Sequence, residues 1–219
     1  MGDVYTVDPG ARDLDAVADL AGLLALAWGQ PSQMLAEALI DETWADGVRE
    51  CVAPLLPGDA QDGLLDALGV LAVSVAGSSP VTLAIDLAAE YAALFQGPGR
   101  ALVKAYECQW VEAEGATLFI APTSLAVEAS YRAAGLEVAT HEPPDCLATE
   151  LAFVRYLAQA EAPGKFSERR RVFLTAHVDR WAGRFCEAVE QATEHGAYAA
   201  LARITAIVVD ARLLHSATT

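Results

Sequence analysis

The densest group of side chains that could do chemistry lies between residues 141 and 150. Four potential metal ligands fall within six residues: His141, Glu142, Asp145 and Cys146. Two prolines between them make this segment a loop that could wrap around an ion. A structural zinc site also needs a second group of ligands at a characteristic spacing, and none follows. We therefore expect no metal ion at this loop.

The carboxylates of the same loop support a different chemistry. Glu142 and Asp145 flank the diproline, and Glu150 follows Asp145 by five residues. Carboxylates form paired, charge-assisted hydrogen bonds with arginine, so the loop could be an acidic rim that receives a partner's guanidinium groups. The simpler interpretation makes Asp145 the N-cap of the next helix, worth about 1 kcal/mol. The loop by itself leaves both interpretations open.

Signatures of catalysis are absent from the sequence. It contains no G-x-S-x-G motif, no glycine loop for phosphate and no H-E-x-x-H pair. His177 lies on the apolar stripe of a predicted helix, where a hydrogen-bonded histidine in a core or groove is the ordinary case. We predict a protein that is not an enzyme and has no cofactor. The one enzymatic alternative uses the loop from His141 to Cys146 with a metal.

Charge and cysteine usage restrict the partners and the compartment. The net charge is −16, and residues 1–100 hold 15 acidic side chains against three basic ones, Arg12, Arg49 and Arg100. Such a surface repels nucleic acid and anionic lipid and attracts basic partners, although solubility alone would explain it equally well. Four separated cysteines without a C-x-x-C pair indicate reduced thiols in the cytoplasm. The N-terminus has no signal-peptide pattern, and Gly77 to Pro80 interrupts the uncharged residues 67–85, so we expect no stable membrane insertion.

Helical periodicity runs through most of the chain. The hydrophobic fraction is 54%, much of it alanine, and only 7% of the residues are aromatic, which favours helices over strands. Capping residues and Gly or Pro stops delimit predicted helices at 11–28, 32–51, 59–76, 80–96, 123–135, 145–160, 167–195 and 197–214. The helix after Ser167 carries Trp181 and Phe185, which we expect in the core.

These elements predict an all-α bundle of about eight to ten helices. Residues 97–121 have no sustained period but contain aromatic residues, so we expect a long ordered loop. Residues 1–120 would form an N-terminal helical part with this loop, and residues 121–219 a C-terminal helical part, within one compact fold. The loops at 97–121 and 137–145 would act as hinges between the two parts.

Three stretches together resemble the TorD/DmsD family of redox-enzyme maturation chaperones, relatives of the NarJ type. The first is EYAALFQGPG at 90–99 with YECQW at 106–110, similar to the family's E-Y-x-x-L-F-x-G-P and Y-E-S-V-Y elements. The second is EPPDCLATELAF at 142–153, similar to E-P-x-D-H-x-x-x-E-L-x-F. The third, from Phe173 to Phe185, resembles F-L-x-x-H-x-x-x-W-x-x-x-F. Cys146 stands where the family has a histidine, which leaves the effect of losing that imidazole open, and Cys108 replaces a serine.

The resemblance implies a TorD-like all-α bundle and a cytoplasmic chaperone. It would bind the twin-arginine signal peptide of a molybdopterin oxidoreductase and hold the apo-form of that subunit until its cofactor is loaded. Two adjacent arginines followed by an apolar stretch require carboxylates beside an apolar groove. The residues expected to bind the leader are Tyr91, Leu94, Phe95, Tyr106, Trp110, Glu142, Pro143, Asp145, Cys146 and Glu150.

Two further questions stay open from the sequence. The alternative function is a helical assembly factor that binds the mature catalytic subunit for cofactor insertion, and not its leader. Long hinge loops also permit domain swapping, so that monomer and swapped homodimer are both compatible with the sequence. The identity of the client oxidoreductase does not follow from these residues.

Overall fold

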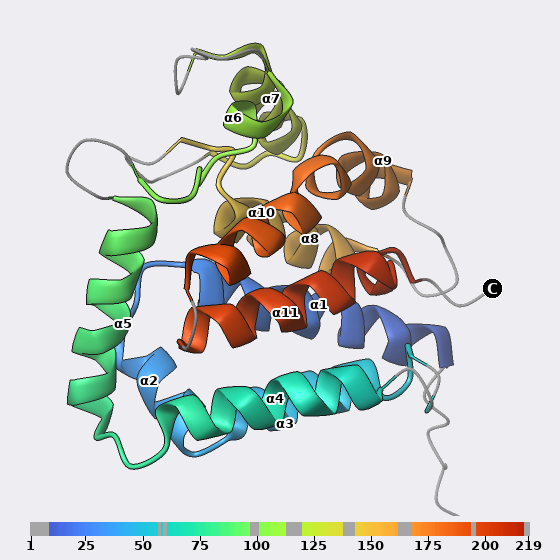
Figure 1. The fold of residues 1–219 in the computed structure, drawn as a ribbon. Helices are drawn as coiled ribbons and strands as arrows, with labels where there is room; N and C mark the ends of the chain where they lie inside the picture. Colours follow the sequence, from blue (N-terminus) through green and yellow to red (C-terminus); the bar gives the residue numbers. More distant parts are fainter. Residues whose placement is uncertain are drawn as a thin grey trace, which may run out of the picture.

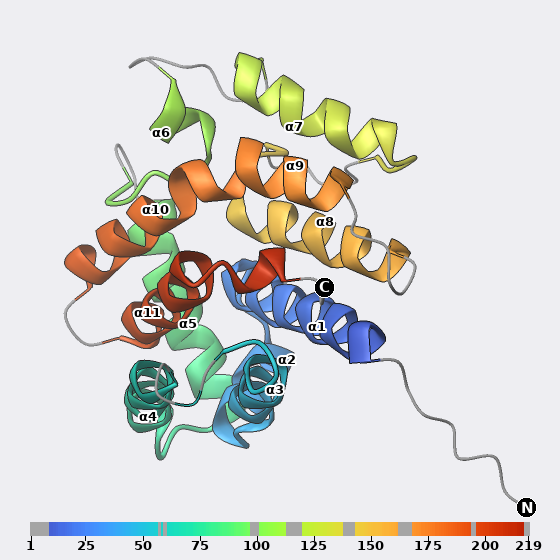
Figure 2. The same ribbon diagram turned by 90° about the vertical axis from the view of Figure 1, so that its right-hand side faces the viewer.

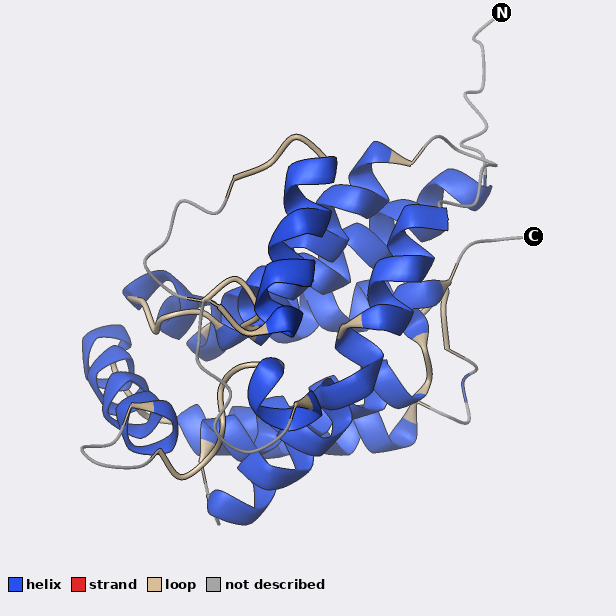
Figure 3. Ribbon diagram, turned by 90° about the horizontal axis from the view of Figure 1, so that it is seen from above, coloured by secondary structure: helices blue, strands red, loops and turns tan. Residues whose placement is uncertain are grey.

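The computed structural model describes residues 9–56, 58, 61–96, 101–112, 120–137, 143–161, 168–193 and 196–216. Within these ranges the prediction of an all-α fold is confirmed, with eleven α-helices and no strand (Figures 1 and 3). The helices are α1 (Pro9–Trp28), α2 (Gln33–Ile40), α3 (Thr43–Val52), α4 (Asp62–Val75), α5 (Pro80–Phe95), α6 (Cys108–Val111), α7 (Pro122–Ala133), α8 (Leu147–Ala160), α9 (Glu168–Ala176), α10 (Val178–Ala192) and α11 (Ala197–Asp210), followed by a 3-10 turn, η2 (Leu213–His215).

Several helix boundaries follow directly from capping residues. Ser32 accepts a hydrogen bond from the Leu35 N–H at 3.2 Å, and Ser79 accepts one from the Thr82 N–H at 3.1 Å. Pro80 occupies the first turn of α5, where its missing N–H costs nothing. Gly135 takes a positive φ of 80° just after α7, a conformation that favours glycine. These predicted starts and this stop are confirmed.

The helices of the two sequence halves are packed against one another. Helix α1 packs against α8 and α3, α10 packs against α11, and α11 rests on α4 (Figures 1 and 2). Helix α5 contacts mainly α2 and stands at one edge of the molecule (Figure 1). The division into parts 1–120 and 121–219, with hinges between them, stays a prediction.

The core is apolar and contains a cluster of aromatic rings. Trp181 and Phe185 are only 1% and 3% exposed, as expected for core residues. The Trp28 ring meets the Phe185 ring edge-on, with centroids 4.9 Å apart. Such edge-to-face pairs add about 0.5–1.5 kcal/mol beyond the burial of their area. This cluster joins the C-terminal end of α1 to α10.

Two of the predicted helices are each divided by a short break. Residues 32–51 form α2 and α3, because Glu42 takes a left-handed φ of 63° and Asp41 accepts a hydrogen bond from the Thr43 N–H at 3.1 Å. The predicted helix after Ser167 forms α9 and α10, and the break is His177, whose φ of −125° and ψ of −84° are not helical. Apolar periodicity continues across both breaks, which is why the sequence pattern did not predict them.

No single helix in the described ranges is long and apolar enough to cross a membrane. Helices α4 and α5 together would satisfy the length and composition, but they are bent by 110° with respect to each other.

Candidate functional site

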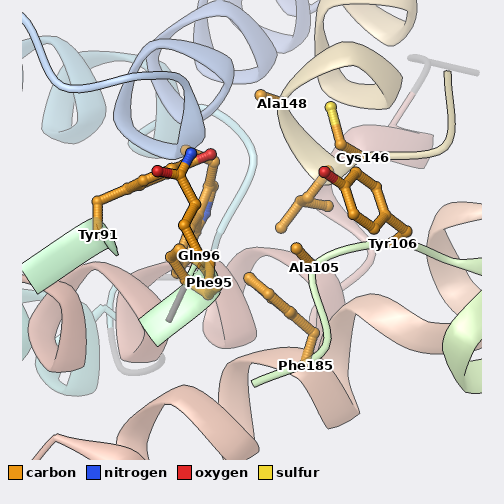
Figure 4. A pocket seen from close by; sticks show the side chains of 10 residues that line it. Tyr91, Phe95, Gln96, Ala105, Tyr106, Cys146, Ala148 and Phe185 are labelled. Atoms are coloured by element: carbon orange, nitrogen blue, oxygen red, sulfur yellow. The ribbon is translucent and has the colours of Figure 1, made fainter. Parts of the chain in front are cut away.

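A cleft with aromatic walls lies where α1, α5, α8 and α10 approach the segment around residue 106 (Figure 4). Its empty space, counted out to the open solvent at its mouth, is about 430 Å³. Its lining residues are Trp28, Tyr91, Phe95, Gln96, Ala105, Tyr106, Cys146, Leu147, Ala148 and Phe185. Four of the predicted leader-binding residues are therefore brought together: Tyr91, Phe95, Tyr106 and Cys146.

Helix α5 provides one wall of the cleft. Tyr91 and Phe95 are four residues apart and share one face of the helix, with ring centroids 4.9 Å apart. Phe95 also stacks on Phe185 of α10 at 5.7 Å with an interplanar angle of 22°. Trp28 is fixed at the end of α1 because its indole N–H donates to the Thr205 hydroxyl at 3.0 Å. Rings held in this way form a preorganised apolar surface.

The opposite wall consists of two short segments paired through their backbones. Tyr106 and Cys146 form an isolated antiparallel bridge, and the Glu107 N–H donates to the Asp145 carbonyl at 2.8 Å. The Asp145 side chain strengthens this pairing, because its Oδ2 accepts the Cys108 N–H at 2.9 Å. Two motifs that are far apart in sequence thus form a single rigid wall.

Three carboxylates lie fully buried behind this wall: Glu107, Asp145 and Glu150. Glu107 Oε2 is 2.9 Å from His177 Nδ1, and Glu150 Oε2 accepts the indole N–H of Trp181 at 3.1 Å. Within the described residues, one oxygen of each carboxylate has no hydrogen-bond partner when all three are ionised. Buried carboxylates in this proximity cannot all carry a charge without a large free-energy cost.

Burial favours the neutral form of Glu150. Burial, and next the negative charge of Glu107, raise the pKa of Glu150 well above its usual value. A neutral Glu150 can donate a hydrogen bond to Glu107 while still accepting from Trp181. Burial likewise raises the pKa of the Cys108 thiol to about 12, so that this cysteine is not a nucleophile. The cluster is therefore a structural network that supports the cleft wall.

The predicted helix cap at Asp145 is wrong. Cys146 is the N-cap residue of α8, without a side-chain cap hydrogen bond, and the Asp145 carboxylate turns to the Cys108 N–H. The preceding turn directs Asp145 into the interior, where its side chain is inaccessible to solvent. Glu150 is equally buried. A direct contact between either carboxylate and a partner's arginine would require the wall to open, and these contacts stay predictions.

The remaining predicted residues lie in several environments. Leu94 belongs to the core, with 2% of its surface exposed, and Pro143 is buried. Trp110 does not line the cleft: its indole N–H donates to the Lys104 carbonyl at 3.0 Å, and the Arg184 guanidinium lies 5.8 Å from its ring centroid. Glu142 and His141 lie outside the described residues.

Some lining residues were not among the predicted binding residues. Trp28 lies far before the first matching motif, and only its place on the apolar stripe of α1 marks it. Phe185 was expected in the core; it is buried there and also lines the cleft. The third motif, which contains Phe185, was the signal that could have identified it.

A sequence model of the nitrate reductase delta subunit matches residues 58–187, more than half of the chain. The chain belongs to this family. Members of the nitrate reductase delta family are chaperones for the maturation of molybdoenzymes. The match includes every cleft-lining residue except Trp28. The predicted resemblance to redox-enzyme maturation chaperones is thereby confirmed, whereas the finer assignment to TorD/DmsD members stays a prediction. No curated protein matches the chain.

Proposed function

We propose that this delta-family chaperone binds the twin-arginine signal peptide of a molybdopterin oxidoreductase in the cytoplasm. It would hold the apo-form of the client through this leader until the cofactor is loaded. The apolar side chains of the leader enter the aromatic cleft, against Tyr91, Phe95 and Tyr106. Release of the leader then permits export.

The observation that carries this proposal is the cleft itself. Its rings come from α1, α5 and α10, and its second wall is built from the two motifs that form the bridge between Tyr106 and Cys146. Aromatic rings with fixed positions and a few polar atoms are typical of sites that bind apolar peptide segments.

The arginines of the leader have a different role in this proposal. Since Asp145 and Glu150 are buried, the arginines are attracted first by the field of residues 1–100, with their 15 acidic and three basic side chains. Long-range attraction of this kind accelerates association and is screened at high ionic strength. The buried carboxylates act indirectly, by holding the wall that the apolar residues contact.

Calorimetric titration with a synthetic twin-arginine leader tests the proposal. The Ala105→Leu variant fills part of the cleft without removing any existing contact, and Ala129→Leu adds the same atoms on the exposed side of α7. We expect Ala105→Leu to weaken binding by about tenfold or more, equivalent to about 1.4 kcal/mol, and Ala129→Leu to leave it unchanged.

Two results would contradict the proposal. One is equal affinity of the wild type and Ala105→Leu for the leader, with both proteins folded by circular dichroism. The other is capture of a client subunit lacking its leader as efficiently as the complete subunit. The second result would favour the assembly-factor function, in which the mature subunit is the ligand.

A further inference from the structure

The outward face of α5 is unusually apolar for an exposed helix. Val81 and Ile85 are 57% and 64% exposed, and Ala88 and Ala92 are exposed as well. These four residues follow one another at spacings of four, three and four, which places them on one side of the helix. We name them the α5 stripe. Helix α5 contacts mainly α2, and its buried residues are Leu83, Leu87 and Leu94, which leaves the stripe open to solvent.

The α5 stripe ends next to the aromatic cleft. At 3.6 residues per turn, the next positions along the same side of the helix are Phe95 and Gln96, and both line the cleft. From Val81 to Gln96 the stripe and cleft residues extend over about 22 Å at 1.5 Å per residue. The two features therefore follow one another along one side of a single helix, with Phe95 as the apolar residue that joins them.

The charge around the α5 stripe indicates what covers it. Residues 50–99 contain six acidic side chains and neither lysine nor arginine. Asp86, on the same helix, is exposed. A second copy of a chain with a net charge of −16 would be repelled, and so would an anionic lipid surface. Charge complementarity favours an apolar segment that carries basic residues.

We propose that the α5 stripe is the second half of the leader site, an inference that depends on the function proposed above. The cleft is too small for the whole apolar stretch of a leader and receives only the residues nearest the arginines. The following residues continue as a helix along α5, with side chains at helical spacing packed against Val81 and Ile85. Binding of the leader would thus cover the largest exposed apolar side chains of α5.

Two synthetic peptides separate the two halves of the site. The short peptide contains the paired arginines and about six apolar residues, and the long one contains about fifteen, enough to follow α5 at helical rise. The double variant Val81→Gln and Ile85→Gln makes the stripe polar without altering charge. Leu125→Gln, on α7 and 47% exposed, is the matched control.

The expected result is a selective loss. The double variant should bind the long peptide about tenfold more weakly than the wild type and the short peptide equally well. Leu125→Gln should bind both peptides as the wild type does. Unfolding midpoints should be unchanged, because all three side chains are exposed.

Each other outcome has a defined meaning. If the wild type binds both peptides with one affinity and the double variant does the same, the stripe is not part of the site, while the proposed function stands. If the wild type binds neither peptide, the proposed function fails and this inference with it. The inference is also overturned if the double variant converts a dimer into a monomer in sedimentation, or if it abolishes binding to phosphatidylglycerol vesicles, since a second copy or a membrane would then cover the stripe.

Discussion

The contrast between Asp145→Ala and Asp145→Asn distinguishes a positioning role from direct contact with a leader. The Asp145 side chain has no exposed surface, and its Oδ2 accepts the Cys108 N–H at 2.9 Å. Alanine removes the acceptor and leaves a buried N–H without a partner. A hydrogen bond to a charged group contributes about 1.5–3 kcal/mol, so we expect Asp145→Ala to lower the free energy of unfolding by that amount.

Two effects make the asparagine variant milder. The Asn carbonyl oxygen can still accept the Cys108 N–H, and the neutral amide removes the contribution that Asp145 makes to the raised pKa of Glu150. We therefore expect Asp145→Asn to stay within about 1 kcal/mol of the wild type, the size of a typical net hydrogen-bond contribution. Urea denaturation followed by circular dichroism measures both differences.

Leader affinity decides between the two roles. A positioning residue predicts that Asp145→Asn binds a twin-arginine peptide as tightly as the wild type, because the wall of the cleft is preserved. If Asp145→Asn keeps its stability but loses affinity by tenfold or more, the carboxylate itself contacts arginine, and a purely positioning role for Asp145 is wrong. Calorimetry at low ionic strength gives this comparison with the least screening.

Two further predictions concern the buried groups. Because the pKa of Glu150 in the folded chain is raised above its unfolded value, its contribution to stability is complete below pH 4.5 and is lost as the pH rises through the folded pKa. The Glu150→Gln variant keeps an acceptor for Trp181 but cannot titrate, so its free energy of unfolding should fall less steeply with rising pH than that of the wild type. Denaturation curves at a series of pH values measure this, and an unchanged slope of unfolding free energy against pH would show that another group titrates. Thiol labelling at pH 8 should modify Cys146, which lines the cleft, far faster than Cys108, because burial raises the pKa of the Cys108 thiol to about 12. Bound leader should slow the labelling of Cys146. Equal labelling rates with and without leader would place the ligand elsewhere.

The sequence predicted the elements of this fold better than it predicted the orientation of individual side chains. Tyr91 and Phe95 were correctly grouped, because residues four apart on a helix share a face. The partner of Asp145 was not predicted: as a helix cap it would bind an amide at the start of α8, but its carboxylate accepts the Cys108 N–H instead. Spacing within a motif shows which residues are close, but the direction of a side chain in a turn depends on the partner segment.

Sequence patterns also fail to predict residues that reach the site only through packing between distant helices. Trp28 reaches the cleft because α1 packs against α8, and no local pattern near residue 28 indicates that neighbour. The break at His177 has a similar origin, since the imidazole leaves the helical path to meet Glu107 on a distant segment. Both features depend on contacts between distant segments, and the periodicity of one segment carries no information about such contacts.

The packing of α1 against α8 also has a consequence for biosynthesis. The apolar face of α1, with Leu20 and Leu24 fully buried, is covered by a helix that the ribosome makes only after α2 to α7. A nascent chain therefore exposes this face throughout most of its translation, and long-range closure of this kind is slow relative to local helix formation. We expect a chaperone of this architecture to need protection itself while it is being made, and fragments truncated before α8 to aggregate.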